Sequence, residues 1–491
     1  MSHHDPHPTA TLPAREGIPH DPATENSRSW GVLIVALVAQ VLVVLDISIV
    51  NTALPTIGQS LHLDSGDLQW LVTAYLLLSG GGLLLGGRVA DLFSRRRVFM
   101  TGLGLFTTAS FIAGFASSAT VLIAARATQG LGAALMTPAA LSLIMTTYSG
   151  AQRARGLALW GAVGSMSVAG GVLFGGMLTT WAGWQTIFWV NVPVGAAAFV
   201  ASLLVLPRQT TARADRSRLD LPGGVTLVAG LTALLLGIEG ASRNGWTSPA
   251  TLALFAAATA GLTGFLAIER RVASPLVPPH TWKVQSLVAG TGVMLGATGI
   301  LVGTIFLTSI FVQTVLGYTA LQTGLAFLPL ALAMAAAAHS ASHLAAVVAA
   351  RWIAGTGLAL TVAGSLLLSR PPVTAHYATD LLPGLLLLGF GIGLVFVSVS
   401  MTAMNGIPAQ HAGMASGFLM TGHEVGAALG VAIISAVAAT GGSLATAAGA
   451  GDAFGRGMVG AAVLAVAVAV VAVTKMPATR QAAGAVVHMH H

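Results

Sequence analysis

Two carboxyl groups lie deep within apolar stretches of this sequence, where an ionisable side chain is costly and where the expected chemistry is proton binding. Asp46 interrupts the aliphatic run from Val41 to Pro55, VLVVLDISIVNTALP, and Glu424 lies near the middle of another apolar run. Ionisable groups at membrane depth almost always face a cavity, a partner or a transport pathway. Because burial disfavours the charged form of a carboxyl group, Asp46 is expected to gain and lose a proton. The alternative is a buried acid that a fixed partner neutralises.

One basic residue, Arg126, also lies within an apolar run, and an arginine at such a depth needs a partner or water. Glu424 directly follows His423, so it could be a second proton site, a contact for cationic substrates or one half of a static pair. Asp46, Glu424 and Arg126 are therefore predicted to couple protons to function. The polar residues that could line a cavity beside them are Asn51, Gln129, Gln313 and His423.

The composition indicates that these groups belong to a membrane protein. Of the 491 residues, 55% are hydrophobic and 8% are charged, whereas soluble proteins carry about 25% charged residues. The chain has no cysteine, which excludes disulfides and thiolate metal sites. Its basic residues fall in short loops between apolar runs, a pattern that indicates orientation in a bilayer and argues against nucleic-acid binding.

The sequence lacks the motifs of common enzyme classes. The pair His423-Glu424 lacks the second histidine of a zinc-protease HExxH motif, because position 427 is Ala427. There is no GxSxG nucleophile motif, and neither lysine follows a glycine, which excludes a phosphate-binding Walker A loop. We therefore expect a protein that is not an enzyme, with no catalytic residues, no metal site and no cofactor.

Apolar runs long enough to cross a bilayer recur along the chain. A helix needs about 20 residues to cross roughly 30 Å of hydrocarbon. Fourteen such runs predict an all-α integral membrane protein with 14 transmembrane helices. The predicted spans are 31–57, 68–90, 97–116, 119–146, 157–178, 185–206, 220–240, 250–268, 285–311, 321–339, 351–369, 381–401, 412–438 and 456–474.

The charges and lengths of the loops predict how these helices are oriented in the membrane and how they are grouped. With both termini cytoplasmic, 18 of the 22 Lys and Arg residues lie at the cytoplasmic side, as the positive-inside rule requires. Two polar connections group the helices as six, two and six, which is typical of secondary transporters built from repeated halves. The predicted division is a disordered cytoplasmic tail at 1–29, an N-terminal six-helix bundle at 30–206, a linker with two extra transmembrane helices at 207–283, a C-terminal six-helix bundle at 284–475 and a cytoplasmic tail at 476–491.

A glycine, a spaced aspartate and a basic cluster occupy the short turn after the second predicted span. The stretch from Gly87 to Arg97 reads GRVADLFSRRR. It resembles the signature of the major facilitator superfamily at this turn, where ion pairs can break and re-form between conformations. The resemblance implies a conformational switch, whose residues here are Gly87, Arg88, Asp91, Arg95 and Arg96.

Further runs narrow the resemblance to one branch of that superfamily. Arg126, with Gln129 and Gly130, resembles the family's second motif, which implies that the arginine faces the cavity near Asp46. The fifth predicted span resembles the glycine-rich motif of proton-coupled exporters, although glycines at such spacings also serve helix packing. With the runs LDISIVNTALP, WQTIFWVNVPVG and QTVLGYTALQTGLAFLP, the chain is similar to the 14-helix drug:proton antiporters. The glycines of the antiport or packing motif are Gly164, Gly171, Gly175 and Gly176.

This resemblance implies a proton-coupled secondary active exporter of hydrophobic or cationic drug-like compounds that works by alternating access. The alternative is a proton-coupled uptake symporter of a small metabolite on the same scaffold. The expected partners are a small-molecule substrate, protons and the lipid bilayer, with no nucleic acid. We expect a monomer in the cell membrane with both termini cytoplasmic.

Overall fold

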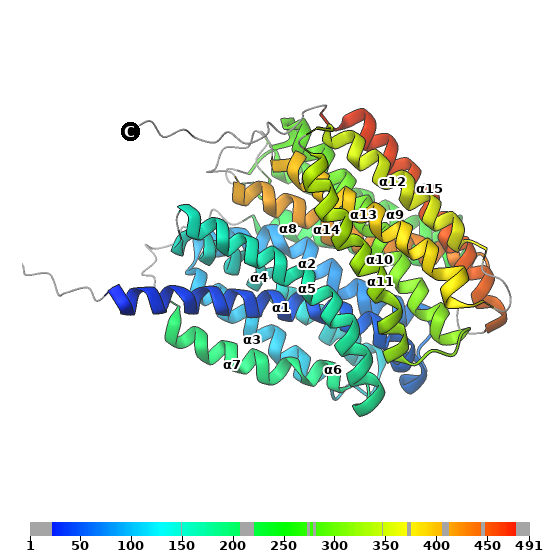
Figure 1. The fold of residues 1–491 in the computed structure, drawn as a ribbon, viewed down its shortest axis with the longest axis horizontal. Helices are drawn as coiled ribbons and strands as arrows, with labels where there is room; N and C mark the ends of the chain where they lie inside the picture. The colour runs from blue at the N-terminus through cyan, green and yellow to red at the C-terminus, as the bar shows by residue number, and fades with distance from the viewer. Residues whose placement is uncertain are drawn as a thin grey trace, which may run out of the picture.

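The chain folds into two groups of long α-helices that run roughly side by side (Figure 1). The structure is a computed structural model. It describes residues 22–148, 150–206, 220–272, 275–277, 281–345, 347–370, 375–404, 412–442 and 447–477. Within these ranges every regular element is a helix and no strand occurs, so the prediction of an all-α membrane protein is confirmed.

The helices follow one another with short connections. The first group is α1 (Pro22–Leu61), α2 (Ser65–Leu92), α3 (Arg95–Ala113), α4 (Ala119–Thr147), α5 (Gly150–Ala182), α6 (Thr186–Trp189) and α7 (Asn191–Val205). An inserted pair follows, α8 (Leu221–Asn244) and α9 (Pro249–Glu269). The second group is α10 (Gln285–Thr314), α11 (Ala320–Leu344), α12 (Ala350–Leu368), α13 (Leu382–Met404), α14 (Ala412–Ala439) and α15 (Ala447–Lys475).

In the described part of the chain these helices make the fourteen predicted membrane crossings, with α6 and α7 counted as one. Twelve segments are long and apolar enough to cross a membrane, and α3 and α5 complete the set. The sixth crossing consists of α6 followed by α7, with Val190 between them in the αR conformation. The first helix begins at Pro22, before the apolar run, because proline fits the first turn of a helix well. The tail boundary expected at residue 29 therefore falls within α1.

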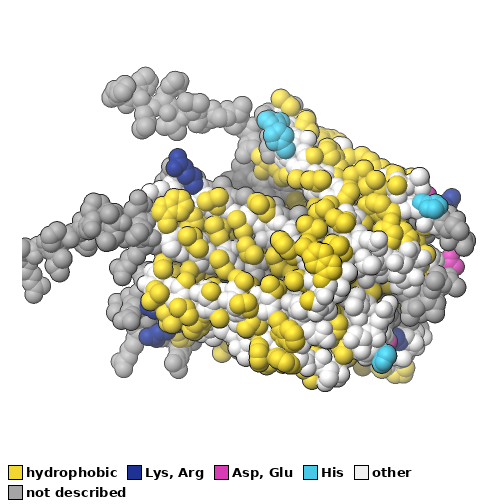
Figure 2. All heavy atoms as spheres, turned by 60° about the horizontal axis from the view of Figure 1, so that its bottom comes forward, with side chains coloured by type: hydrophobic (Ala, Val, Ile, Leu, Met, Phe, Trp, Pro, Cys, Tyr) yellow, Lys and Arg dark blue, Asp and Glu magenta, His cyan; other side chains and the backbone are white. Residues whose placement is uncertain are grey.

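Hydrophobic side chains cover much of the side of the molecule (Figure 2). Phe115, Leu204 and Val463 are each more than half exposed, which would be unfavourable for so many large apolar groups in water. Charged side chains in the same view lie toward the two ends of the molecule. This distribution matches a bilayer that surrounds the middle of the helices.

The two six-helix bundles meet mainly along three helix pairs, with a smaller contact between α1 and α11. One bundle is α1 to α7 and the other is α10 to α15, and they meet where α2 packs on α14, α5 on α11 and α1 on α10. The inserted pair lies outside both bundles. Its helix α8 packs against α2 and α14 and so covers one seam between the bundles, whereas α9 packs mainly on α8.

Charged residues fasten the end of α8 to the start of α2. Arg243 of α8 forms ion pairs with Asp64 (3.1 Å) and with Glu239 (3.2 Å). Trp70 Nε1 of α2 donates a hydrogen bond to Glu239. The backbone N–H of Asp67 lowers the pKa of Asp64 below its usual value, and Arg243 acts in the same direction. The inner helix of the pair is therefore held to the N-terminal bundle by polar contacts at one end of the apolar spans.

The C-terminal bundle contains a close backbone contact between α10 and α14. A Cβ atom added at Gly430 would overlap the backbone of Gly299, so the two helices touch where neither has a side chain. Lipid is as apolar as the helix surfaces, so helices in a membrane associate largely through such close packing. This contact is expected to contribute directly to stability.

Gly430→Ala is expected to lower the thermal unfolding midpoint in detergent, because the added methyl group must push α10 and α14 apart. Overpacking of this kind typically costs about 1–3 kcal/mol. Gly417→Ala in the same helix is the matched control, since a Cβ atom there has nothing within 4 Å. The control should leave the midpoint unchanged or raise it, because alanine favours helix. Equal midpoints for the two variants would contradict the packing argument.

Candidate functional site

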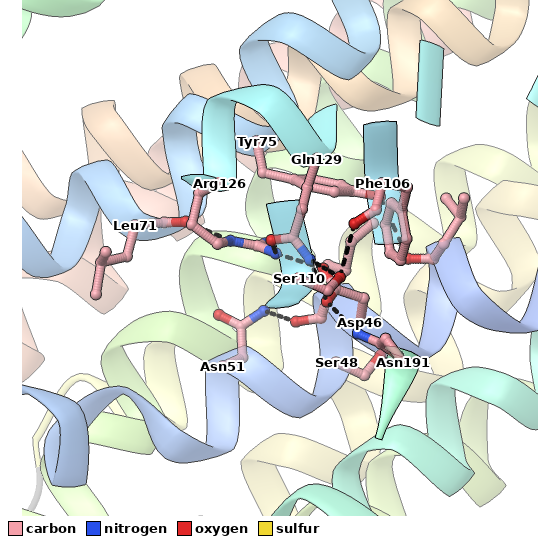
Figure 3. Close-up of polar contacts among 12 residues, drawn as sticks. Asp46, Ser48, Asn51, Leu71, Tyr75, Phe106, Ser110, Arg126, Gln129 and Asn191 are labelled. Atoms are coloured by element: carbon pink, nitrogen blue, oxygen red, sulfur yellow. Dashed lines mark hydrogen bonds and ion pairs between the residues drawn. The ribbon is translucent and has the colours of Figure 1, made fainter. Parts of the chain in front are cut away.

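Asp46 lies at the centre of a buried polar network (Figure 3). Its side chain is fully buried in α1, and its carboxylate forms an ion pair with Arg126 of α4, which is also buried. The same carboxylate accepts hydrogen bonds from Gln129 of α4 and Asn191 of α7. The arginine that sequence analysis found in an apolar run is therefore the direct partner of the acid in α1.

Three more contacts fix the guanidinium group of Arg126. Its Nε donates to the carbonyl oxygen of Leu71 in α2 (3.0 Å), and its Nη1 donates to Gln129 Oε1 (3.0 Å). The ring of Tyr75 lies 4.4 Å from the guanidinium carbon, in a cation–π arrangement. A guanidinium group away from water needs partners for its donors. Helix α2 supplies them with a backbone carbonyl and an aromatic face.

Amide side chains hold the second oxygen of the carboxylate. Gln129 Nε2 lies 3.2 Å from Asp46 Oδ1, and Asn191 Nδ2 lies 3.0 Å from it. Gln129 Nε2 also donates to Ser110 Oγ of α3 (2.7 Å), and Ser110 donates to the carbonyl oxygen of Phe106 (2.9 Å). Both carboxylate oxygens thus accept bonds from protein groups, so the site can hold a negative charge without water.

Glycines let α4 approach its neighbours closely enough for this network to form. A Cβ atom at Gly130 would overlap the carbonyl oxygen of Tyr75 in α2. Gly132 packs on Gly102 of α3, where an added Cβ atom would lie 2.7 Å from the carbonyl oxygen. The segment Gln129-Gly130-Leu131-Gly132 therefore combines a polar side chain with the close helix contacts that bring it to the carboxylate.

Two glycines of α5 pack directly on the segment of α1 that carries Asp46. A Cβ atom at Gly171 would lie 2.6 Å from Ser48 Cβ, and one at Gly175 would lie 2.9 Å from Ile49 Cα. Any larger residue at these positions would displace α1. The glycine-rich fifth span thus serves close helix packing beside the acid, and whether it also sets the direction of transport stays a prediction.

The next glycine of α5 lies at the contact between the bundles. A Cβ atom at Gly176 would lie 2.6 Å from Leu321 Cα of α11. Close by, the backbone N–H of Leu321 donates to Thr180 Oγ1 of α5 (3.2 Å). The remaining glycine of the motif, Gly164, is in α5 but lies outside the residues whose surroundings the structure describes.

Polar contacts also join α1 to α10 where Pro55 interrupts the hydrogen bonds of α1. Proline has no N–H group, so the carbonyl oxygen four residues earlier, on Asn51, loses its helical donor. Ser309 Oγ of α10 supplies a hydrogen bond to that oxygen (2.8 Å). Gln313 Nε2 donates to the next carbonyl oxygen, on Thr52 (3.1 Å). Gln313 therefore lies at the contact between the bundles, whereas the side chain of Asn51 is buried and donates to the carbonyl oxygen of Ile47 within α1 (2.9 Å).

Glu424 occupies a different environment at the seam between α2 and α14. It accepts a hydrogen bond from Ser79 Oγ of α2 (3.0 Å), and His423 Nδ1 lies 3.6 Å from its other oxygen. Its side chain is 15% exposed and that of His423 is 33% exposed, whereas Asp46 is not exposed at all. A Cβ atom at Gly80 would lie 2.5 Å from the Glu424 Cβ, so α2 and α14 touch here.

One face of α2 contacts both acidic sites. Leu71, Tyr75 and Ser79 follow one another at intervals of four residues, which places them on the same face of the helix. The first two contact Arg126, and Ser79 bonds to Glu424. Asp46 and Glu424 are far apart in the sequence, and the structure shows that a single helix contacts the surroundings of both.

The predicted switch residues lie where α2 ends and α3 begins. Arg96 Nη2 donates to the carbonyl oxygen of Leu203 at the end of α7 (2.8 Å). Among the described residues, the Nε atoms of Arg88 and Arg95 have no hydrogen-bond partner. The side chain of Asp91 lies outside the described part of the structure, and Gly87 lies in the last turns of α2. The role of this turn as a switch stays a prediction.

The network includes residues that sequence analysis did not select. They are Asn191, Ser110, Tyr75 and Ser79. A signal existed for Asn191, which is a polar residue two positions before Pro193 in an otherwise apolar span. Serine and tyrosine are common enough in membrane helices that their presence predicts no site.

Comparisons with known proteins agree with this geometry. Residues 36–431 match the sequence model of the Major Facilitator Superfamily. The cephamycin export protein CmcT of Amycolatopsis lactamdurans is 35% identical over 95% of this chain and 96% of its own length. The puromycin resistance protein pur8 of Streptomyces alboniger is 37% identical over 84% of this chain and 82% of its own.

A solved structure has the same fold. The nucleoside transporter NupG aligns with a TM-score of 0.62 over 90% of this chain and 99% of its own, at 11% sequence identity. Identity at that level shows the fold alone. Together with the extent of the sequence match, it establishes that this chain is a multi-pass membrane transporter of the Major Facilitator Superfamily.

Proposed function

We propose that this protein is a proton-coupled antiporter that exports hydrophobic or cationic drug-like compounds by alternating access. The observation that carries the proposal is the fully buried ion pair between Asp46 and Arg126 within the N-terminal bundle. Several relatives are named as antibiotic export or resistance proteins, which favours export over uptake of a metabolite. We place the protein in the cell membrane, as a monomer with both termini cytoplasmic.

The ion pair suits proton exchange because each partner stabilises the charge of the other. Protonation of Asp46 would remove its attraction to Arg126 and leave the guanidinium group with the backbone of Leu71, the side-chain oxygen of Gln129 and the ring of Tyr75. A buried charge that loses its partner is strongly unfavourable. Proton binding would therefore make the present arrangement of α1, α2 and α4 less favourable and so favour a different one.

The contacts between the bundles indicate which side is closed. Ser309 and Gln313 contact α1 late in its length, and α5 meets α11 near Gly176, beyond the middle of α5. Both helices begin on the side of the termini, so these contacts lie on the opposite side. With the termini in the cytoplasm, these contacts support an inward-facing arrangement in the proposed cycle.

Protons and substrate would then act through linked equilibria. In the inward-facing state Asp46 is ionised and paired, and substrate binds from the cytoplasm. After the bundles reorient, the site opens to the more acidic outer side, where a proton binds and substrate leaves. If the proton weakens substrate binding, substrate must weaken proton binding by the same factor, because coupling between two ligands is reciprocal.

Glu424 is more accessible to a substrate than Asp46 is. It is partly exposed and bears one hydrogen bond from Ser79, whereas every oxygen of Asp46 is already bonded within the protein. We propose that Glu424 attracts cationic substrates, while Asp46 exchanges the proton. His423, beside it on α14, would adjust this attraction according to its own charge.

Asp46→Asn tests the proton site. The variant keeps the shape of the side chain and cannot ionise, so proton release on substrate addition should disappear and energised efflux should fall by at least about tenfold. Proton release is measured with a pH-sensitive dye on purified protein, and efflux in vesicles with an imposed pH gradient. Asp452→Asn, which changes an exposed acid at the start of α15, is the matched control and should behave like the parent protein.

This variant leaves Arg126 without its partner, and removing one partner from a buried pair costs about 3–5 kcal/mol. If Asp46→Asn therefore accumulates poorly, the double variant with Arg126→Gln removes the unpaired charge and should restore accumulation of the protein without proton release. Normal substrate-induced proton release and uphill export by either variant would show that Asp46 is not the coupling residue.

Glu424→Gln tests the substrate contact. It should weaken binding of a cationic substrate by about tenfold, the equivalent of 1.4 kcal/mol, while binding of a neutral substrate of similar size stays unchanged. Ser79→Ala is the companion variant, because it removes a hydrogen bond from Glu424 and keeps the charge. Equal losses for both substrates would contradict a charge contact, and loss of proton release would identify Glu424 as a proton site instead.

A further inference from the structure

We propose that His339 and His343 form a surface site for a borderline divalent transition metal such as Zn²⁺, Ni²⁺ or Cu²⁺. Both residues are exposed and lie in the last two turns of α11, at the end of the helix away from Ala320. The apolar span of this helix ends at Ala341, so the pair lies where α11 leaves the apolar region. Nothing in the proposed transport cycle uses these residues.

The spacing of the two histidines is that of a chelating pair. Residues four apart lie on the same face of a helix and are close neighbours. Here the Nε2 atoms are 3.2 Å apart, and the ring centroids are 4.6 Å apart with the rings inclined at 75°. The two nitrogen lone pairs that bind metals in proteins are thus already close together in space.

The nitrogen separation matches a tetrahedral metal ion. Zinc–nitrogen bonds are about 2.0–2.1 Å long, so two nitrogens 3.2 Å apart on one zinc ion would subtend an angle of about 100°. That angle is close to the tetrahedral value. In the absence of metal, the same separation permits a hydrogen bond between a protonated and an unprotonated ring nitrogen. The existing geometry therefore needs little change when a metal ion takes the place of the proton.

The opposite face of the helix holds this geometry in place. Ala337, Ala341 and Ala345 are buried, and they form an apolar cluster with Ile353 of α12 and Leu394 of α13. These alanines are offset by two residues from the histidines, which is about 200° around a helix with 3.6 residues per turn. The histidines thus lie on the outer face of a helix end whose inner face is packed.

The chemistry of the pair selects the metal. Imidazole nitrogen suits zinc, nickel and copper, whereas magnesium and calcium prefer oxygen ligands. In the described part of the chain no group of three or more His, Asp or Glu residues lies together, so the protein supplies two ligands and water completes the coordination. We therefore expect reversible binding, with Cu²⁺ held more tightly than Ni²⁺ or Zn²⁺.

Metal titration of the full-length protein in detergent tests this site. Seven other histidines lie near the two ends of the chain and could compete, so the background protein carries glutamine at positions 3, 4, 7, 20, 488, 490 and 491. This background should bind one equivalent of Cu²⁺ or Ni²⁺. Its Cu²⁺ spectrum in electron paramagnetic resonance should show coupling to two imidazole nitrogens.

His339→Gln and His343→Gln should each weaken Ni²⁺ binding by about tenfold or more, and each should leave one coupled nitrogen in the Cu²⁺ spectrum. His376→Gln is the matched control, since His376 is exposed and belongs to a different helix connection. Hydrogen exchange adds a readout of position: metal should slow amide exchange at the end of α11 in the background protein and not in either variant. Unchanged metal affinity in the double variant, or a Cu²⁺ spectrum with a single nitrogen in the background protein, would overturn the proposal.

Discussion

A buried ion pair between Asp46 and Arg126 constrains how the whole N-terminal bundle is built. Moving a carboxylate and a guanidinium group out of water costs several kcal/mol for each ion, and their attraction offsets this only if the remaining donors and acceptors are also bonded. Four other groups meet that condition, and they come from four helices in addition to α1: Leu71 of α2, Ser110 of α3, Gln129 of α4 and Asn191 of α7. One interaction thus accounts for polar residues in four apolar helices and for a backbone contact from a fifth, α2.

Glycine contacts explain how helices can satisfy such a pair in lipid. Short polar side chains bridge only short distances, so α4 must lie close to α2 and α3, and Gly130 and Gly132 permit this. Similar contacts at Gly171 and Gly175 press α5 onto the same segment of α1. A small residue also lies at the contact between the bundles, where Gly176 of α5 packs on Leu321 of α11. Close glycine packing thus occurs both within the N-terminal bundle and at its contact with the other bundle.

The sequence alone predicted the features that follow from the free-energy cost of placing a charge in an apolar segment or an apolar segment in water. It missed the features that depend on how the helices are arranged in space. A charge such as Asp46 or Arg126 is so unfavourable in an apolar run that its presence alone predicts a partner, and fourteen apolar runs predict fourteen crossings because length and hydropathy decide insertion. Asn191 contacts Asp46 only because α7 packs beside α1, and the apolar residues of the sixth crossing do not say which helix is its neighbour. The position of α8 over the seam between the bundles could not be predicted either, because the sequence of an apolar helix face is similar whether lipid or another helix covers it.

The arrangement of α2 gives the two acids a physical connection that their separation in sequence conceals. Arg126 rests on Leu71 and Tyr75, and Ser79, one turn further along the same face, bonds to Glu424 in the opposite bundle. Under the proposed function, protonation of Asp46 frees Arg126 to shift against α2, and any rotation or slide of α2 carries Ser79 with it. The hydrogen bond to Glu424 is one of the contacts that hold the bundles together at this seam, so it would be strained by the same movement. In this proposal a proton at one acid would be coupled to substrate at the other through the displacement of a single helix, and the two ligands would not need to compete for one carboxylate.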